Sequence, residues 1–351
     1  MAAATPPANV SATMGDGSAG HLAPAGQSLE DLACAYWGSD TLFAALELDL
    51  FATLGDGTLT LAALASSARC RPAPLARLLT ALARLNLVQE HHDGWRNLPL
   101  ALRHLVPGGP EHLGDFLLYR RYLQPPWRGL AQAVAARPLP PALSRDDDYP
   151  TRNRHYVRAL DQLARRKARE IIAELRHIPW RGPILDVGGG AGALCRALVQ
   201  EEQAPNATLF DLPEVLAAAQ ELYPAPEDWH GISPQAGEFI SHPFASQERF
   251  GMIVLANFLH IYNETDARQC LAKARTLLEA GGHLLIHDYC PDRGASKGAL
   301  YDLNMLINTA DGQCHTACDL ISWLAALGLS DARAIDLPSD SALIIARRPP
   351  C

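Results

Sequence analysis

The chain has 351 residues, of which 48% are hydrophobic and 19% are charged, and its formal net charge is −8. This length accommodates two domains, and the hydrophobic fraction excludes a protein that is disordered throughout. The negative charge argues against nonspecific nucleic-acid binding, and the apolar runs are too short for a membrane-spanning helix. Because the N-terminus lacks a signal-peptide pattern and the eight cysteines are scattered, we expect a cytoplasmic protein with reduced thiols.

The chain begins with a low-complexity segment and continues into helical patterns. Residues 1–27 are mostly small or polar, a composition that predicts a disordered tail. Over residues 28–105, Ser28 and Asp31 have the spacing of a helix cap, leucines recur at helical intervals, and Asp93-Gly94 is typical of a hairpin. Two helical stretches and a hairpin predict a winged-helix domain. Its eight acidic and six basic residues do not make the basic face that DNA binding requires.

Residues 106–178 are predicted to form a helical linker. Prolines interrupt its first half, and the stretch 144–150, with three consecutive aspartates, is interpreted as an irregular connection. A long helix is expected over residues 152–178. We interpret the Arg165-Arg166-Lys167 run on this helix as a solvent-exposed face.

From residue 179 onwards, strands alternate with helices. Short apolar strands are predicted at 184–187, 207–211, 252–255, 283–286 and 342–346. Helical patterns separate them, most clearly over residues 266–278. This alternation is typical of an α/β fold with a doubly wound, Rossmann-like parallel sheet, so we expect residues 179–351 to form the second domain.

A glycine-rich loop follows the first of these strands and opens a helix. Gly188 and Gly190 allow a tight turn and close approach of a ligand, and Asp211 ends the next strand, where a carboxylate can accept both ribose hydroxyls of an adenosine. Asp186 precedes the glycines, where it would repel a pyrophosphate and attract the ammonium group of S-adenosylmethionine. We therefore favour S-adenosylmethionine over a nicotinamide dinucleotide, with a loop that serves only tight packing as the structural alternative.

An ordered set of motifs extends from this loop toward the end of the chain. It comprises the glycine loop, Asp211-Leu212-Pro213, Gly237-Glu238-Phe239, Leu259-His260, Gly281-Gly282, Gly312 and Thr316. Over residues 28–351 the chain resembles the S-adenosylmethionine-dependent O-methyltransferases of the caffeate and acetylserotonin type, including their bacterial small-molecule branch. The resemblance implies a class I methyltransferase sheet, a winged-helix dimerisation domain that builds a homodimer, and a substrate pocket to which residues 106–178 contribute.

The resemblance also implies roles for individual residues. Cofactor contacts are expected from Asp186, Gly188, Gly190, Asp211, Leu212, Glu238 and Phe239. His260 aligns with the catalytic base of the family, and Asp288 aligns with a carboxylate that holds this base. The acceptor, a small and aromatic molecule, is expected to contact Tyr156, Leu160, Met305, Asn308 and Cys314.

Two positions beside the expected base depart from the family pattern. Ile261 stands where the family has an aspartate, and Cys314 stands where it has a glutamate that flanks the histidine. One of two expected carboxylate partners is therefore missing. Cys314, His315 and Cys318 could ligate zinc, but no second Cys-x-x-Cys pair accompanies them, so we expect a buried thiol and no metal.

Together these residues predict methyl transfer to a hydroxyl group of an aromatic or polyketide-like small molecule. His260 would act as general base, and Asp288 would fix its tautomer. The structural alternative for His260 is a cap on the helix that starts near residue 264, and His287 is expected on the opposite face of its strand. Two other functions stay open: decarboxylation or hydroxylation by a related enzyme that uses S-adenosylmethionine, and a non-catalytic dimeric partner.

Overall fold

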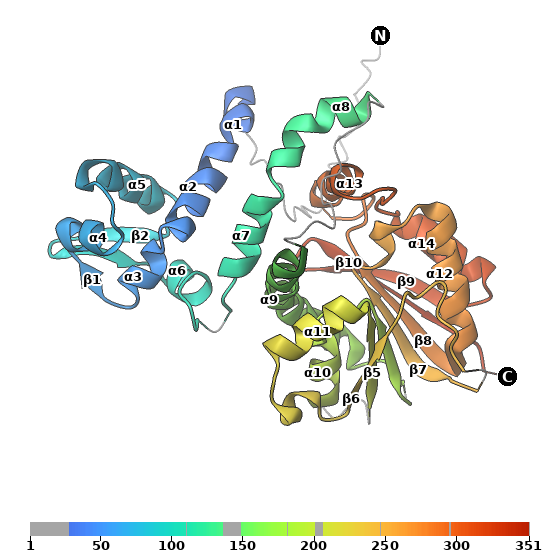
Figure 1. Ribbon diagram of the computed structural model, residues 1–351. Coiled ribbons are helices and arrows are strands. Elements are labelled where there is room, and N and C mark those ends of the chain that lie inside the picture. Colours follow the sequence, from blue (N-terminus) through green and yellow to red (C-terminus); the bar gives the residue numbers. More distant parts are fainter. Residues whose placement is uncertain are drawn as a thin grey trace, which may run out of the picture.

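The computed structural model describes residues 28–109, 111–135, 149–180, 182–200, 206–245, 247–294 and 296–350. The predicted tail and most of the predicted irregular connection before residue 149 lie outside the described residues. Figure 1 shows an N-terminal group of helices with a small sheet and a C-terminal layered α/β part. Helices α7 (Gly114–Tyr122) and α9 (Tyr149–Leu175) lie between them.

The N-terminal part has the predicted order of helices and hairpin. Its helices are α1 (Leu29–Cys34), α2 (Tyr36–Glu47), α3 (Leu50–Leu54), α4 (Leu61–Ser67), α5 (Pro72–Arg84) and α6 (Pro99–His104). Strands β1 (Thr58–Leu59), β3 (Gly94–Asn97) and β2 (Val88–His91) pair antiparallel in that order. The predicted capping box of Ser28 and Asp31 is confirmed. At Gly94, φ is 147° and a Cβ would lie 2.3 Å from the Leu59 carbonyl oxygen, so the hairpin requires glycine there.

One face of this part is left uncovered by the described chain. Leucines of α3, α4 and α5 are buried in its core. In contrast, Leu29, Leu32, Tyr36 and Trp37 on α1 and α2 are between 53% and 87% exposed. The helical spacing of Leu32 and Tyr36 therefore marks a second apolar face outside the core of this domain.

Helices α7 and α9 pack against each other. Gln162 Nε2 donates to Asp115 Oδ2 at 2.6 Å, and the Phe116 amide donates to Gln162 Oε1 at 3.1 Å. After α7, the chain forms the 3-10 helix η1 (Pro125–Gly129), where prolines predict a break, and α8 (Leu130–Val134). The prediction of an exposed basic run on α9 is wrong at Lys167, which is only 3% exposed.

The C-terminal part contains a seven-stranded sheet in the order β6-β5-β4-β7-β8-β10-β9. The parallel strands are β4 (Ile184–Val187), β5 (Ala207–Asp211), β6 (Ile232–Ala236), β7 (Phe250–Ala256) and β8 (Leu278–Asp288). Strands β9 (Ser330–Leu337) and β10 (Ser341–Arg347) form a hairpin antiparallel to β8. The predicted doubly wound α/β sheet is confirmed. The sequence does not predict β6 and β9, because these edge strands carry many polar residues and lack a continuous apolar run.

Helices cover both faces of this sheet (Figure 1). The helices that follow α9 are α10 (Ala193–Gln200), α11 (Pro213–Leu222), α12 (Glu264–Leu277), α13 (Lys297–Asn308) and α14 (Ala317–Ala326), with 3-10 turns η2 (Pro226–Trp229) and η3 (Leu259–Ile261). One apolar cluster joins the sheet to α12 and α14, and another joins it to α9 and α10. Strand order reverses around β4, and ligands of doubly wound sheets bind at the carboxyl ends of strands at such a point. None of the described helices is long and apolar enough to cross a membrane.

Candidate active site

The glycine loop leaves β4 with its backbone in conformations that favour glycine. The φ angles of Gly188 and Gly190 are 66° and 59°. A Cβ on Gly188 would lie 2.5 Å from the Phe258 ring, whereas a Cβ on Gly190 would meet no atom within 4 Å. Gly188 is therefore required by packing, and Gly190 turns its backbone toward open space that a ligand can fill.

Asp186 is buried at the base of this loop with only part of its carboxylate satisfied. Its Oδ2 accepts from the Cys195 thiol at 3.3 Å, while its Oδ1 has no hydrogen-bond partner among the described residues. Burial raises the pKa of Asp186 to about 7, and the charge of Asp211 adds to this shift. An ammonium group at Oδ1 would supply the missing partner and favour the ionised carboxylate.

Asp211 stands beside the loop at the carboxyl end of β5. Its Oδ2 accepts from the Gly190 amide at 2.8 Å, and its Oδ1 accepts from the Leu212 amide at 2.7 Å. Burial raises the pKa of Asp211 to about 6, against the effect of these two hydrogen bonds. Each carboxylate oxygen keeps capacity for a further donor such as a ribose hydroxyl.

Glu238 and Phe239 follow β6 on the same edge of the sheet. The Glu238 carboxylate accepts from the amides of Ile240 at 3.0 Å and Ser241 at 2.8 Å, so it closes a tight turn. Phe239 is buried, and its ring lies edge-on to Phe210 and Phe258 with centroids 6.0 Å apart in both pairs. This turn and this aromatic cluster together shape one wall of the cavity described next.

One cavity of about 590 Å³ joins nearly all of the predicted site residues. The seven predicted cofactor residues line it, as do His260, Tyr156, Leu160, Met305 and Asn308. Asp288 and Cys314 are the two predicted residues that do not line it. The cavity lies where the carboxyl ends of β4 and β5 meet α9 and α13, which is the position expected for a doubly wound sheet.

His260 and Asp288 form a buried pair at this cavity. His260 Nδ1 lies 2.6 Å from Asp288 Oδ1, and the Tyr289 amide donates to the same oxygen at 2.8 Å. Burial alone would raise the pKa of Asp288, but the neighbouring His260 reverses the effect, so the pKa is lowered and the group stays ionised. With Asp288 accepting the proton on Nδ1, Nε2 is the ring nitrogen that can accept a proton from a ligand.

His260 does not cap helix α12, which was the structural alternative to a role as base. The side chain of Asn263 caps α12 by accepting from the Asp266 amide at 3.0 Å. The His260 ring instead lies edge-on to the Tyr301 ring, with centroids 5.2 Å apart.

The two departures from the family pattern occupy different places. Ile261 is on the cavity wall and partly exposed. Cys314 lies behind the wall, packed with Tyr289 and Met305, which differs from the expectation that it contacts the acceptor. Burial raises the pKa of its thiol well above the usual range. In the described residues, Asp288 is therefore the carboxylate that contacts His260.

The residues once considered for a zinc site make separate contacts. His315 Nε2 lies 3.3 Å from the Leu259 carbonyl oxygen, and the Cys318 amide donates to Asp292 at 3.1 Å on the surface. Within the described ranges, potential metal ligands lie together in the N-terminal hairpin, at His91, His92 and Asp93. None of these three residues lines the cavity.

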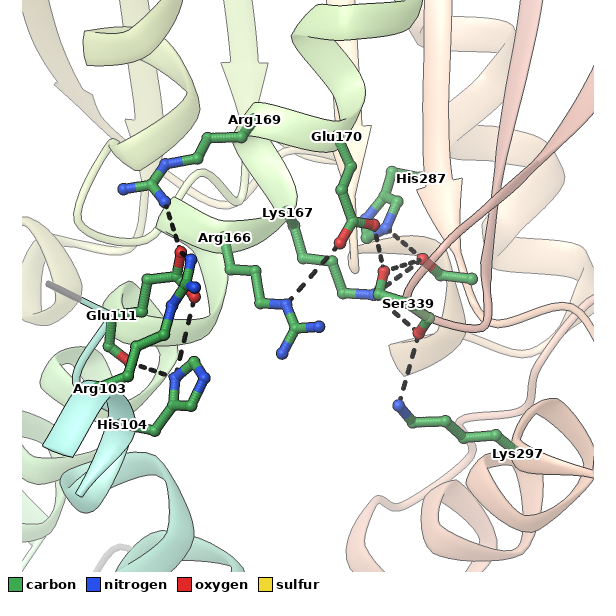
Figure 2. Close-up of polar contacts among 11 residues, drawn as sticks. Arg103, His104, Glu111, Arg166, Lys167, Arg169, Glu170, His287, Lys297 and Ser339 are labelled. Carbon is green, nitrogen blue, oxygen red and sulfur yellow. Dashed lines mark hydrogen bonds and ion pairs between the residues drawn. The ribbon is translucent and has the colours of Figure 1, made fainter. Parts of the chain in front are cut away.

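Lys167 also lines this cavity, although its sequence context predicts an exposed side chain. It donates to Ser341 Oγ at 2.9 Å and contacts both the carbonyl and the hydroxyl oxygen of Ser339 (Figure 2). Ser341 Oγ in turn lies 2.9 Å from His287 Nε2, so His287 belongs to this network and not to the His260 pair. The helical spacing from Lys167 to the buried Ile171 indicates the inner face of α9 and could have revealed its position.

Comparison with known proteins agrees with this geometry. The family model of the O-methyltransferase domain matches residues 139–330, and that of the O-methyltransferase dimerisation domain matches residues 30–107. The chain is 30% identical to the 3-hydroxy-5-methyl-1-naphthoate 3-O-methyltransferase of Streptomyces sahachiroi, over 90% of this chain and 92% of that protein. It is 28% identical to the tetracenomycin polyketide synthesis 8-O-methyl transferase of Streptomyces glaucescens, over 94% and 98% of the two chains.

The solved structures include the same family. The structure of human N-acetylserotonin methyltransferase in complex with S-adenosylmethionine superposes with a TM-score of 0.83 at 26% identity, over 96% of this chain and 100% of that one. Both domain families match in the order in which the two parts of the fold occur. The chain therefore belongs to the S-adenosylmethionine-dependent O-methyltransferases.

Proposed function

We propose that the protein transfers a methyl group from S-adenosylmethionine to a hydroxyl group of an aromatic or polyketide-type small molecule, with His260 as general base and Asp288 as its positioning residue. The observation that carries the proposal is the buried His260–Asp288 contact of 2.6 Å on a cavity that also contains the glycine loop. Two relatives named for naphthoate and polyketide methylation support this acceptor class.

The residues around the glycine loop fit S-adenosylmethionine, which supplies the electrophilic methyl group when bound. The unpartnered Oδ1 of Asp186 suits the ammonium of its amino-acid part, and Asp211 suits the ribose hydroxyls. Leu212 and Phe239 offer apolar contact to an adenine ring, with Glu238 at its edge. Three carboxylates in this region also favour a ligand with positive charge over a pyrophosphate.

His260 would remove the proton of the acceptor hydroxyl as that oxygen bonds to the methyl carbon, while the carbon–sulfur bond breaks and leaves S-adenosylhomocysteine. A phenol is a weak nucleophile until it loses this proton, and a positioned base contributes about 10²–10⁴-fold in rate. The Asp288 carboxylate holds Nδ1 and stabilises the positive charge that forms on the ring. The cavity contributes by aligning oxygen, carbon and sulfur, since such orientation can be worth about 7–11 kcal/mol.

The acceptor would lie between α9 and α13. Tyr156 and Leu160 contribute from α9, and Met305 and Asn308 contribute from α13. Asn308 donates to Asn304, but its Oδ1 is buried without a partner among the described residues, so it is available to a donor group of a ligand. Cys314 would act on the acceptor only through Met305, against which it packs.

We also propose a homodimer built on the N-terminal domain. The match to a dimerisation domain and the exposed apolar side chains Leu29, Leu32 and Trp37 support it, because an apolar face of this kind is typical of an interface. Replacing Leu32 and Trp37 with Glu should give monomers in sedimentation velocity. A dimer that persists in this variant would contradict the assignment of the face.

The proposed function is tested by two measurements on the purified protein. Calorimetry should detect binding of S-adenosylmethionine and its demethylated product, S-adenosylhomocysteine. Transfer of radiolabelled methyl groups should then be measured on a panel of hydroxynaphthalenes and polyketide phenols. If the cofactor binds but no panel member is methylated, the result would instead support one of the functions without methyl transfer. Release of carbon dioxide from an aromatic acid would point to decarboxylation.

A further inference from the structure

A second cavity of about 500 Å³ adjoins the first. The two share several lining residues, which are Arg120, Leu123, Leu163, Lys167, Tyr289, Tyr301 and Asn304. The second cavity extends past them between α7, η1, α9 and α13 to the turn that precedes β10. A ligand bound near His260 can therefore extend into this space.

Four cationic side chains line the second cavity, namely Arg120, Arg166, Lys167 and Lys297. Figure 2 shows Arg166 and Lys167 projecting from α9 and Lys297 reaching toward Ser339 from α13. Arg166 has a carboxylate partner, because its Nε lies 3.9 Å from Glu170 Oε1. Lys167 is held by the oxygens of Ser339 and Ser341.

Arg120 and Lys297 have no carboxylate at ion-pair distance in the part of the chain that is described. Lys297 Nζ makes a long contact of 3.4 Å with the Ser339 carbonyl oxygen. The Arg120 guanidinium lies over the rings of Phe116 and Tyr301, 5.0 Å and 5.7 Å from their centroids. Planar cations over aromatic rings keep their edge donors free for an anion.

The cluster carries an excess of positive charge, because its four cations face Asp340 on the same cavity and Glu170 beside Arg166. Burial lowers the pKa of Lys297, and although Asp340 opposes this, Arg120 and Arg166 reinforce it. Burial likewise lowers the pKa of Lys167 to about 8, against the effect of Glu170, and Lys297 adds to the shift. Buried cations are costly unless they are paired, so an anionic group bound here would be favourable.

The cluster lies within reach of the proposed base. The Tyr301 ring centroid is 5.2 Å from the His260 ring and 5.7 Å from the Arg120 guanidinium carbon, which places the base and the cation at most about 11 Å apart. A compact aromatic skeleton with the hydroxyl group and the acid group on one ring can bridge such a distance, because the two hydrogen-bond contacts take up part of it. The walls between them are aromatic and apolar, with Tyr289, Tyr301 and Leu123 on both cavities.

We propose that the acceptor is an aromatic carboxylic acid whose carboxylate binds Arg120 and Lys297 while its hydroxyl group faces His260. The inference rests on the proposed function, because it assigns the acceptor to the same cavity. It adds a recognition site for the end of the acceptor that does not react. A charge-assisted contact to Arg120 would also fix the distance of the hydroxyl group from the base.

The test compares an acid with its neutral counterpart. 3-Hydroxybenzoate and its neutral amide, 3-hydroxybenzamide, should be titrated into the protein saturated with S-adenosylhomocysteine. The acid should bind at least about tenfold more tightly than the amide, which corresponds to one charge-assisted contact of ordinary strength. The double variant Arg120→Gln, Lys297→Met should bring this ratio close to one and leave S-adenosylhomocysteine affinity unchanged.

Two further variants separate the local charge from other effects. Arg120→Lys keeps the charge and should retain part of the preference for the acid. Arg169→Gln removes an arginine from the same helix as Arg166, but Arg169 lines neither cavity and pairs with Glu111 at 3.2 Å, so the preference should remain.

Several outcomes would overturn the inference. The first is that the acid binds no more tightly than the amide or does not bind detectably. The second is that the double variant still prefers the acid. The third is that Arg169→Gln abolishes the preference as fully as the double variant does. None of these bears on methyl transfer itself, because transfer to neutral phenols is measured separately. Conversely, absent S-adenosylhomocysteine binding would contradict the proposed function.

Discussion

The cofactor half and the acceptor half of the cavity are built in different ways. The cofactor half consists of strand ends and the loops that follow them, with Asp186, Asp211 and Glu238 held by backbone amides or by the buried position of their strands. The acceptor half consists of side chains from α7, α9, α13 and η3, which are far apart in the sequence. The first half therefore depends on local backbone geometry, and the second depends on how helices pack.

The two halves also carry opposite charges. Three carboxylates surround the cofactor region, whereas Arg120 and Lys167 lie at the far side where the second cavity begins. A cationic sulfonium cofactor and an anionic acceptor would each meet complementary charge. His260 stands between the two regions, so substitutions on either side should change one binding step and leave the other unaltered.

The largest effect is expected at His260, where the cofactor half and the acceptor half of the cavity meet. His260→Ala should lower turnover at least about a hundredfold, since it removes the general base, while S-adenosylhomocysteine affinity stays close to that of the unchanged protein. Single-turnover methyl transfer and calorimetry measure the two quantities. The exposed His177→Ala serves as the matched control. Turnover that is equal in both variants would show that His260 is not the base.

In the cofactor half, Asp211→Asn should weaken S-adenosylhomocysteine binding by about tenfold to a hundredfold, because hydrogen bonds to a charged acceptor contribute about 1.5–3 kcal/mol each. The affinity of the acceptor should not change. Glu221→Gln on an exposed face of α11 is the control, since among the described residues its carboxylate makes a loose ion pair of 3.9 Å with Arg154. Unchanged affinity for S-adenosylhomocysteine in Asp211→Asn would refute the ribose assignment.

The raised pKa of Asp186 predicts that cofactor affinity depends on pH. With a pKa of about 7 in the ligand-free protein, Asp186 is protonated at lower pH and must release a proton before it pairs with an ammonium group. Affinity should therefore increase with pH and level off above 7, with a loss of up to about tenfold per pH unit below it. Calorimetry in buffers of different ionisation enthalpy would count the released proton. Asp186→Asn should remove the dependence between about pH 6 and 7 and leave the part below pH 6 that Asp211 contributes. A flat profile in the unchanged protein would exclude this linkage.

The same contrast explains what the sequence predicts well. Glycines, strand-end carboxylates and His260 lie in short motifs whose spacing is set by the β-strand and the turn, so their convergence on one cavity follows from local order. Lys167 is misjudged because its neighbours Arg165 and Arg166 are exposed, and the deciding contacts with Ser339 and Ser341 come from more than 170 residues away. The position of Arg120 is not predicted for a similar reason, since Tyr301 on α13 meets it only through helix packing.

The smallest effect is expected at Cys314, where the structure departs from the position assigned by resemblance. Met305 lines the cavity and Cys314 lies behind it, so Met305→Ala should raise the KM of the acceptor several times more than Cys314→Ala does. The Cys314 variant should instead lose about 1 kcal/mol of unfolding free energy, as is typical for truncation of a small buried side chain. Thermal unfolding and acceptor KM, measured on both variants, separate the two effects. An equal rise in KM would place the thiol on the acceptor itself, because a group that acts only through packing cannot match the loss of a direct contact.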